Sequence, residues 1–175
     1  MRILEIVNNI KGAIAPQVMP TKVIAVDGPS FAGKSSISTK IARHLPNCLV
    51  TKIDDIAQRE GWEQIFLADV LVPLSLNKPG KFQRFDENKN AHEWHVVDVS
   101  KYLILDGIRS SHAAFQPFIT YKIFVKTPLD ERLRRGRQLL TKKEYDDWAD
   151  NHKQHEEVYF LNNRVENRAD AIIET

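Results

Sequence analysis

Eight residues near the N-terminus have the types and the spacing that hold a chain of phosphates. The stretch from Gly28 to Ser35 reads GPSFAGKS and fits the pattern G-x-x-x-x-G-K-[ST], the phosphate-binding loop or P-loop. Glycines let such a loop turn tightly and point backbone N–H groups at phosphate oxygens. Lys34 can reach the β- and γ-phosphates of a nucleotide, and the Ser35 hydroxyl can ligate Mg²⁺. The residues expected to contact the phosphates are Gly28, Ser30, Ala32, Gly33, Lys34, Ser35 and Ser36.

The segments on either side of this loop support the interpretation. Residues 22–27 are apolar enough for a buried strand, and residues 35–45 carry apolar side chains at helical spacing. A strand before the motif and a helix after it are the context in which the pattern binds phosphate. The alternative, a glycine turn followed by a chance lysine, does not predict these flanks.

Acidic residues follow three predicted strands, at the ends beyond which open α/β sheets bind their ligands. Asp106 follows the apolar run 103–105 and is expected to hold Mg²⁺ together with Ser35, directly or through water. The alternative for Asp106 is a capping role. Asp27 directly precedes the phosphate-binding loop, where it can brace the loop.

Two further aspartates follow the second predicted strand. Phosphoryl transfer to a hydroxyl benefits from a carboxylate that orients the hydroxyl and accepts its proton. Asp54, the first residue after the strand, is the candidate base. Asp55 is a candidate for binding Mg²⁺ or for capping the next helix, and capping is also the alternative for Asp54.

Four arginines lie within six positions of a predicted helix. They are Arg132, Arg134, Arg135 and Arg137. Guanidinium groups stabilise the charge on a transferring phosphoryl group, and a lid that closes with an arginine keeps water out. The alternative is a solvated basic face, so that only one or two of the four act.

Histidines and aromatic residues give weaker signals. The pairs His92/His95 and His152/His155 lack cysteine partners, which disfavours structural zinc. Three aromatic residues between the second and third strands can stack on a planar substrate or belong to the core. These are Trp62, Phe85 and Trp94. Arg84 and Asp86 flank Phe85 and can hydrogen-bond a sugar or an acid, or form an ordinary ion pair.

The alternation of strands and helices predicts an α/β fold with a mainly parallel five-stranded sheet. Together with the motif, this indicates the three-layer P-loop NTPase fold, with helices on both faces and a small lid at about 130–147. The predicted strands are 22–27, 48–53, 101–106, 120–126 and 169–174. The predicted helices are 33–45, about 62–76, 111–117, 128–140 and 142–161. Segments 81–85 and 94–99 are expected to form short edge strands or a hairpin.

Length and composition indicate one domain over residues 1–175, of ordinary globular composition. The chain is 42% hydrophobic with a net charge of +2, which calls for neither a nucleic acid nor a membrane partner. Residues 1–20 are expected to form an amphipathic helix, with Ile3, Ile6, Val7, Ile10 and Ile14 on one face, and a linker. Polar residues interrupt this segment, so we expect no signal peptide and a cytoplasmic location. Cys48 is expected to be a buried small hydrophobe.

The ordered motifs resemble the uridine kinase-like P-loop kinases, which include relatives of phosphoribulokinase and pantothenate kinase. The resemblance covers about residues 23–173. Its pieces are Val26–Ser30 with Gly33–Ser35, Asp54–Ile56 with Gly61–Trp62, Leu71–Leu74, Arg84–Asp86, Leu105–Ile108, Arg132–Arg135, Trp148 with Glu156, and Arg168–Ile173. The order of these pieces is typical of small-molecule kinases.

The resemblance implies that Lys34 and Ser35 bind ATP with Mg²⁺, that Asp54 is the catalytic carboxylate, and that Arg135 lies in a lid. It assigns the acceptor-binding segment to Arg84, Phe85 and Asp86, and we add Arg132 to the substrate-binding residues. The chain departs from the family at several positions. Asp106 stands where Glu is common, Gly136 where a second lid arginine is usual, Phe85 where Tyr is usual, and Glu87 where an aromatic residue is expected.

The leading hypothesis is therefore transfer of the ATP γ-phosphoryl group to a hydroxyl of a small molecule, most simply a nucleoside such as uridine or cytidine. Pantothenate-like acids, sugars and nucleotides are alternative acceptors, and a non-catalytic nucleotide-binding protein is a further alternative. A regulatory GTPase is disfavoured, because residues 77–80 lack the acid of a guanine-reading Asn-Lys-x-Asp segment. A homodimer is a reasonable default.

Overall fold

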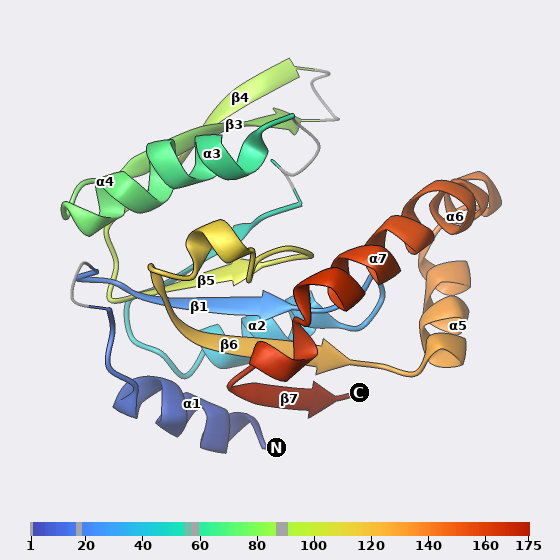
Figure 1. Ribbon diagram of the computed structural model, residues 1–175, viewed down its shortest axis with the longest axis horizontal. Coiled ribbons are helices and arrows are strands. Elements are labelled where there is room, and N and C mark those ends of the chain that lie inside the picture. Colours follow the sequence, from blue (N-terminus) through green and yellow to red (C-terminus); the bar gives the residue numbers. More distant parts are fainter. Residues whose placement is uncertain (1, 17–18, 55, 57–59, 87–90) are drawn as a thin grey trace.

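Five parallel strands form the centre of the protein (Figure 1). The computed structural model describes residues 2–16, 19–54, 56, 60–86 and 91–175, with only the backbone of 85 and 86. The strands are β1 (Lys22–Asp27), β2 (Cys48–Lys52), β5 (Tyr102–Asp106), β6 (Ile119–Lys126) and β7 (Ala171–Glu174). Their order across the sheet is β2-β5-β1-β6-β7. This arrangement confirms the predicted five-stranded parallel sheet, and β1 lies at its centre.

Alternating side chains of β1 face two separate cores. Ile24 and Val26 belong to a cluster under α1 (Ile3–Gly12) and α2 (Lys34–Ala42). Val23 and Ala25 belong to a cluster on the opposite face, formed with the helical segment after β2. Because strand side chains alternate between faces, one apolar strand supplies both cores and gives the three layers.

The helix α1 packs on the sheet as predicted, but its apolar face is shorter than expected. Ile6, Val7 and Ile10 are fully buried, whereas Ile14 is 92% exposed. The prediction for Ile14 is wrong because the helix ends at Gly12. The Lys22 ammonium group donates hydrogen bonds to the last carbonyls of α1, which is favourable at the negative end of a helix.

The predicted helix over about 62–76 forms, with an irregular middle. It consists of α3 (Trp62–Phe66), the π-helical turn η1 (Leu67–Leu71) and α4 (Val72–Ser75). Pro73 cannot donate a hydrogen bond to the preceding turn, and its ring would crowd the carbonyl four residues earlier. The wider turn directly before Pro73 accommodates this residue without ending the helix.

The predicted helix over 111–117 is wrong. Only the short 3-10 helix η2 (Ala113–Phe115) forms there. The backbone N–H and hydroxyl of Ser111 donate hydrogen bonds to a buried aspartate instead of joining a helix, and Pro117 restricts the other end. Tertiary contacts therefore override the local pattern.

A two-stranded antiparallel hairpin lies over α3 and α4 and is separate from the main sheet (Figure 1). Its strands are β3 (Gly80–Asp86) and β4 (Ala91–Val97). Phe82 and Val97 are buried in the same core as Phe66, whose ring centroid lies 5.8 Å from that of Phe82. The hairpin predicted for this region is confirmed.

Helices at the carboxyl-end edge of the sheet include the segment predicted to form a lid (Figure 1). They are α5 (Leu129–Leu139), α6 (Lys142–Asp147), the π-helical turn η3 (Trp148–His152) and α7 (Lys153–Asn163). Thr141 and Glu144 form a capping box that starts α6. Among the residues described, no helix combines the length and hydropathy needed to cross a membrane.

The close approach of the phosphate-binding loop to β6 can be tested at Gly28, the first glycine of the loop. A Cβ added at Gly28 would overlap the backbone carbonyl of Val125, and Gly28 has a φ of +147°. We expect Gly28→Ala to lower the free energy of unfolding by about 1–3 kcal/mol or to prevent folding. The control is Gly12→Ala, which meets open space and is expected to change stability by less than about 1 kcal/mol. Equal melting temperatures for the two variants would contradict the packing described.

Candidate functional site

The loop from Gly28 to Gly33 turns sharply between β1 and α2. Phe31 has a φ of +62° and Gly33 a φ of +89°, both in the left-handed region. Successive turns of this kind form a concave ring of backbone N–H groups that suits an anion. The Lys34 ammonium group, almost buried, donates a hydrogen bond of 3.0 Å to the carbonyl of Pro29. The loop thus has the shape and charge expected of a phosphate site.

The fully buried carboxylate of Asp27 ties the site together. Its Oδ1 accepts hydrogen bonds from the backbone N–H groups of Gly28 at 2.8 Å and Arg109 at 3.1 Å. Its Oδ2 accepts from the N–H and hydroxyl of Ser111 at 3.1 and 2.6 Å, and from the hydroxyl of Tyr159 at 3.2 Å. Burial raises the pKa of Asp27, while the Ser111 and Gly28 donors and the charge of Lys34 oppose the shift. The bracing role predicted for Asp27 is confirmed and extends to three segments.

Asp54 lies two residues after the end of β2, close to the turn that follows β5. Its carboxylate oxygens lie 3.0–3.1 Å from the position that a Cβ of Gly107 would occupy. Although part of the side chain faces solvent, loss of hydration raises the pKa of Asp54 to about 6. The charge of Lys34 opposes this shift, the carboxylate of Asp106 adds to it, and the backbone N–H of Ile108 donates to Asp54. The structure therefore brings together the candidate base, the loop lysine and the candidate metal ligand.

Asp106 has the properties of a metal-ligating carboxylate. The residue is almost buried, and its Oδ1 has no hydrogen-bond partner within the described part of the chain. A buried carboxylate oxygen without a donor is costly unless a cation or water meets it. Ser35 lies in the first turn of α2, where its hydroxyl is exposed. An oxygen from each residue suits Mg²⁺, which prefers few protein ligands together with phosphate oxygens.

The structure distinguishes the four arginines of α5. Arg135 lies over the phosphate-binding loop, with its Nη1 3.3 Å from the carbonyl of Phe31. Arg132 is buried, and its Nε and Nη1 have no hydrogen-bond partner among the described residues. Arg134 pairs with Glu131 at the surface, as Arg135 also does, and Arg137 lies over the ring of Tyr145. Arg135 thus reaches the phosphate-binding loop, and the buried Arg132 lies 4.0 Å from the carboxylate of Glu156.

The helical segment from α5 to α7, which is longer than the lid predicted at about 130–147 and is called the lid from here on, packs directly on the phosphate-binding loop. The buried carboxylate of Glu156 accepts hydrogen bonds from the Ser30 N–H at 2.9 Å, the Ser30 hydroxyl at 2.5 Å and the Trp148 indole at 2.9 Å. The ring centroids of Phe31 and Trp148 are 4.8 Å apart. A Cβ at Gly136 would lie 2.9 Å from the Phe31 ring, so an arginine at this position would require the ring to move. The departure at Gly136 therefore has a steric reason.

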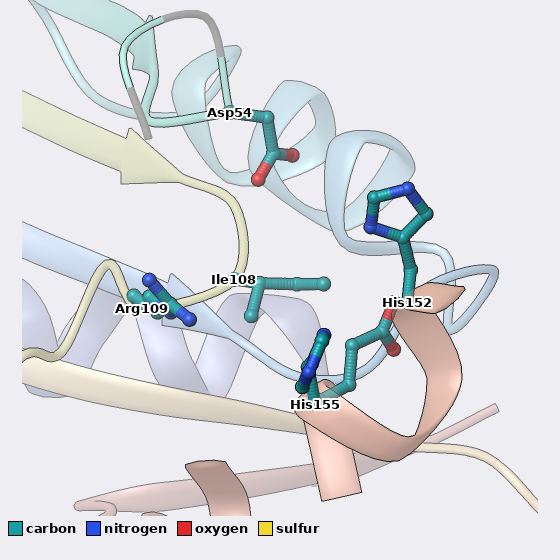
Figure 2. A pocket seen from close by; sticks show the side chains of 6 residues that line it. Asp54, Ile108, Arg109, His152 and His155 are labelled. Atoms are coloured by element: carbon teal, nitrogen blue, oxygen red, sulfur yellow. The ribbon is translucent and has the colours of Figure 1, made fainter. Parts of the chain in front are cut away.

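A cavity of about 220 Å³ opens beside Asp54 (Figure 2). It is lined by Asp54, Ile108, Arg109, His152, His155 and Glu156. The loops after β2 and β5 form one side, and the lid forms the other (Figure 2). This position, next to the candidate base and the phosphate-binding loop, suits a phosphoryl acceptor.

The described residues of the predicted acceptor-binding segment do not line this cavity. Arg84 lies on β3 opposite Glu93 and is not among the residues that line the cavity. The side chains of Phe85 and Asp86 lie outside the described part of the chain, as do all of Asp55 and Glu87. Sequence reasoning missed Arg109, although it follows β5 by the same rule that selected Asp106.

Two other predictions are settled by burial. Trp62 is 2% exposed and packs edge-to-face on Phe115, so it belongs to the core and does not stack on a substrate. Cys48 is only half-buried against the cluster under α1 and α2, so the expected burial is met in part, and loss of hydration raises the pKa of its thiol to about 11. No group of three or more metal-ligating His, Cys, Asp or Glu side chains occurs in the described ranges.

Because Asp27 accepts hydrogen bonds from three segments of the chain, we expect its substitution to lower stability strongly. Asp27→Asn keeps the shape but points an amide N–H₂ at donors, leaving buried groups unpaired, so we expect a loss of about 2–3 kcal/mol of unfolding free energy. Urea unfolding followed by circular dichroism measures the change. The control is Asp98→Asn, at an exposed position. A loss under 0.5 kcal/mol (roughly the scatter of surface substitutions) would show that the hydrogen bonds of Asp27 are not essential to stability.

Comparison with known proteins supports the fold. No model of a known protein family matches the sequence, and no curated protein matches it. A solved structure described as a "Possible Uridine Kinase from Bacillus stearothermophilus" matches with a TM-score of 0.71 at 15% identity, over 98% of this chain and 96% of that one. A "putative fructose transport system kinase from Silicibacter sp. TM1040" matches with a TM-score of 0.73 at 14% identity, over 98% of both chains. The chain has the fold of the P-loop kinases, and its resemblance to uridine kinase-like proteins is confirmed at the level of that fold.

Proposed function

We propose that the protein transfers the γ-phosphoryl group of ATP to a hydroxyl group of a small molecule. The observation that carries this proposal is the position of Asp54. Its carboxylate borders a cavity and interacts electrostatically with both Lys34 and Asp106. A protein that only bound a nucleotide would not need a carboxylate of raised pKa beside an acceptor-sized cavity.

In the proposed reaction, Asp54 orients the acceptor hydroxyl and takes its proton as the new O–P bond forms. The bond between the γ-phosphorus and the β–γ bridging oxygen breaks, and ADP leaves with that oxygen. Lys34, Arg132 and Arg135 supply positive charge to the phosphoryl oxygens. Ser35 and Asp106 would hold Mg²⁺, which would neutralise charge on the phosphates of the bound nucleotide.

The acceptor class follows less directly from the site than the reaction does. The resemblance described above favours a nucleoside such as uridine or cytidine. The solved structures of the same fold include proteins named for a nucleoside and for fructose transport, so the fold supports more than one acceptor.

Two substitutions test the proposed roles separately. Lys34→Ala is expected to weaken ATP binding at least tenfold, because the loop loses its buried positive charge. Asp54→Asn is expected to keep ATP binding and to lose phosphoryl transfer by about 10²–10⁴-fold. ADP release is measured with a panel of nucleosides, sugars and hydroxy acids, and ATP affinity by calorimetry. Lys40→Ala and Asp98→Asn are the matched controls, since both positions are exposed. Unchanged ATP affinity in Lys34→Ala would exclude the proposed nucleotide site.

The raised pKa of Asp54 predicts a pH dependence. A general base acts when deprotonated, so kcat/KM for the acceptor should rise with pH through about 6 and level off above about 7. The profile is recorded from pH 5 to 8, with circular dichroism at each pH to show that the fold persists. A flat profile over this range would contradict the assignment of Asp54 as the base.

A further inference from the structure

The cavity beside Asp54 carries hydrogen-bond donors that the proposed reaction does not use. Arg109, His152 and His155 line it together with two carboxylates, Asp54 and Glu156. The carboxylate of Glu156 is already occupied by the Ser30 and Trp148 donors. Asp54 has the role of base and the Nε2 of His152 lies 3.5 Å from Asp147, so the guanidinium, the His155 ring and the Nδ1 of His152 remain for a ligand.

Arg109 is held firmly at this wall. Its φ of +71° is uncommon for a residue with a side chain, and its backbone N–H donates to the buried Asp27. Its guanidinium carbon lies 5.7 Å from the centroid of the Tyr159 ring, and Tyr159 itself donates to Asp27. Among the described residues, no carboxylate forms an ion pair with Arg109. The side chain is therefore both positioned and unneutralised.

The two histidines come from the lid. His152 ends the π-helical turn η3 and His155 lies in the first turn of α7, three positions later, which places both on one face. Figure 2 shows their rings on the side of the cavity across from the loops that carry Asp54 and Arg109. His152 also lies 3.5 Å from Asp147, at the outer rim. An imidazole offers at least one N–H donor in either protonation state.

We propose that the phosphoryl acceptor carries an acidic group, a phosphomonoester or a carboxylate, which Arg109 binds with help from His152 and His155. This inference rests on the proposed function, since it places the acceptor hydroxyl at Asp54. A planar guanidinium binds either acid through two parallel N–H donors. A cavity of about 220 Å³ suits a compact molecule. An acid-bearing acceptor therefore matches this wall better than a neutral nucleoside.

Matched pairs of probes test the acid separately from the rest of the acceptor. The pairs are ribose 5-phosphate with ribose, and glycerate with glycerol, and calorimetry gives their affinities for the full chain with and without a non-hydrolysable ATP analogue. At least one acid is expected to bind ten times more tightly than its neutral counterpart. The two pairs distinguish a phosphate site from a carboxylate site. Equal affinities within both pairs would overturn the proposal.

Variants assign the effect to the cavity wall. Arg109→Gln is expected to weaken binding of the preferred acid at least tenfold and to leave its neutral counterpart unchanged, and Arg109→Lys is expected to retain part of the affinity. Arg43→Gln, at an exposed position at the end of α2, is the matched control. Thermal melting shows that each variant is folded. Unchanged acid binding in Arg109→Gln would overturn the proposal.

Binding of the ATP analogue shows whether Arg109 acts on the acceptor or on the nucleotide. If Arg109 served the γ-phosphate of ATP, Arg109→Gln would weaken the ATP analogue and spare the acid probe, and that result would overturn the proposal. Preferential phosphorylation of neutral acceptors would also overturn it while leaving the kinase function intact. Absence of ATP binding or turnover in the wild-type protein would instead contradict the proposed function. The affinities for the matched acid and neutral probes would then still decide whether the cavity binds an acid.

Discussion

One buried carboxylate holds the candidate site in place. Asp27 stands at the end of the central strand and accepts hydrogen bonds from the phosphate-binding loop, from the loop after β5 and from α7. These segments are up to 132 positions apart in the sequence. A buried carboxylate must find donors or lose free energy, and here the donors come from the segments that carry the chemistry. The need to satisfy Asp27 thus fixes the relative positions of nucleotide loop, cavity and lid.

A second set of contacts joins the lid to the phosphate-binding loop. Phe31 fits against Gly136 and Trp148, and Ser30 is hydrogen-bonded to Glu156. Phe31 has a left-handed backbone, and its aromatic side chain extends from the phosphate-binding loop to Trp148 and Gly136. The lid therefore takes its position from the same turn that would hold the phosphates.

Much of the fold could be predicted from sequence, because strands buried on both faces appear as continuous apolar runs and helices as apolar residues at helical spacing. The main strands, the hairpin and the loop between β1 and α2 follow from such local patterns. The segment 111–117 could not be predicted, because Ser111 donates hydrogen bonds to Asp27, which lies 84 positions earlier in the sequence. The pattern misplaces Ile14 because helical spacing continues beyond the residue where the helix ends.

The candidate site was predictable in part, for a related reason. Asp54 and Asp106 follow strands, and strand ends converge by topology. Arg109 depends on a left-handed backbone and a stacking partner on α7, neither of which appears in a local pattern. The contact between Glu156 and Ser30 spans 126 positions and is set by packing. The roles of Lys34, Ser35 and the arginines remain predictions until tested.

The π-helical turn before α7 has an evolutionary consequence. Such a turn holds one more residue than an α-helical turn, and each residue added to a helix rotates all later side chains by about 100° around the axis. Gain or loss of one codon between Trp148 and His152 would present a different set of side chains to the cavity while the helix axis kept its course. The same rotation would also carry Glu156 and Tyr159 away from Ser30 and Asp27, so the length of this turn is constrained in descendants by the contacts that hold the phosphate-binding loop.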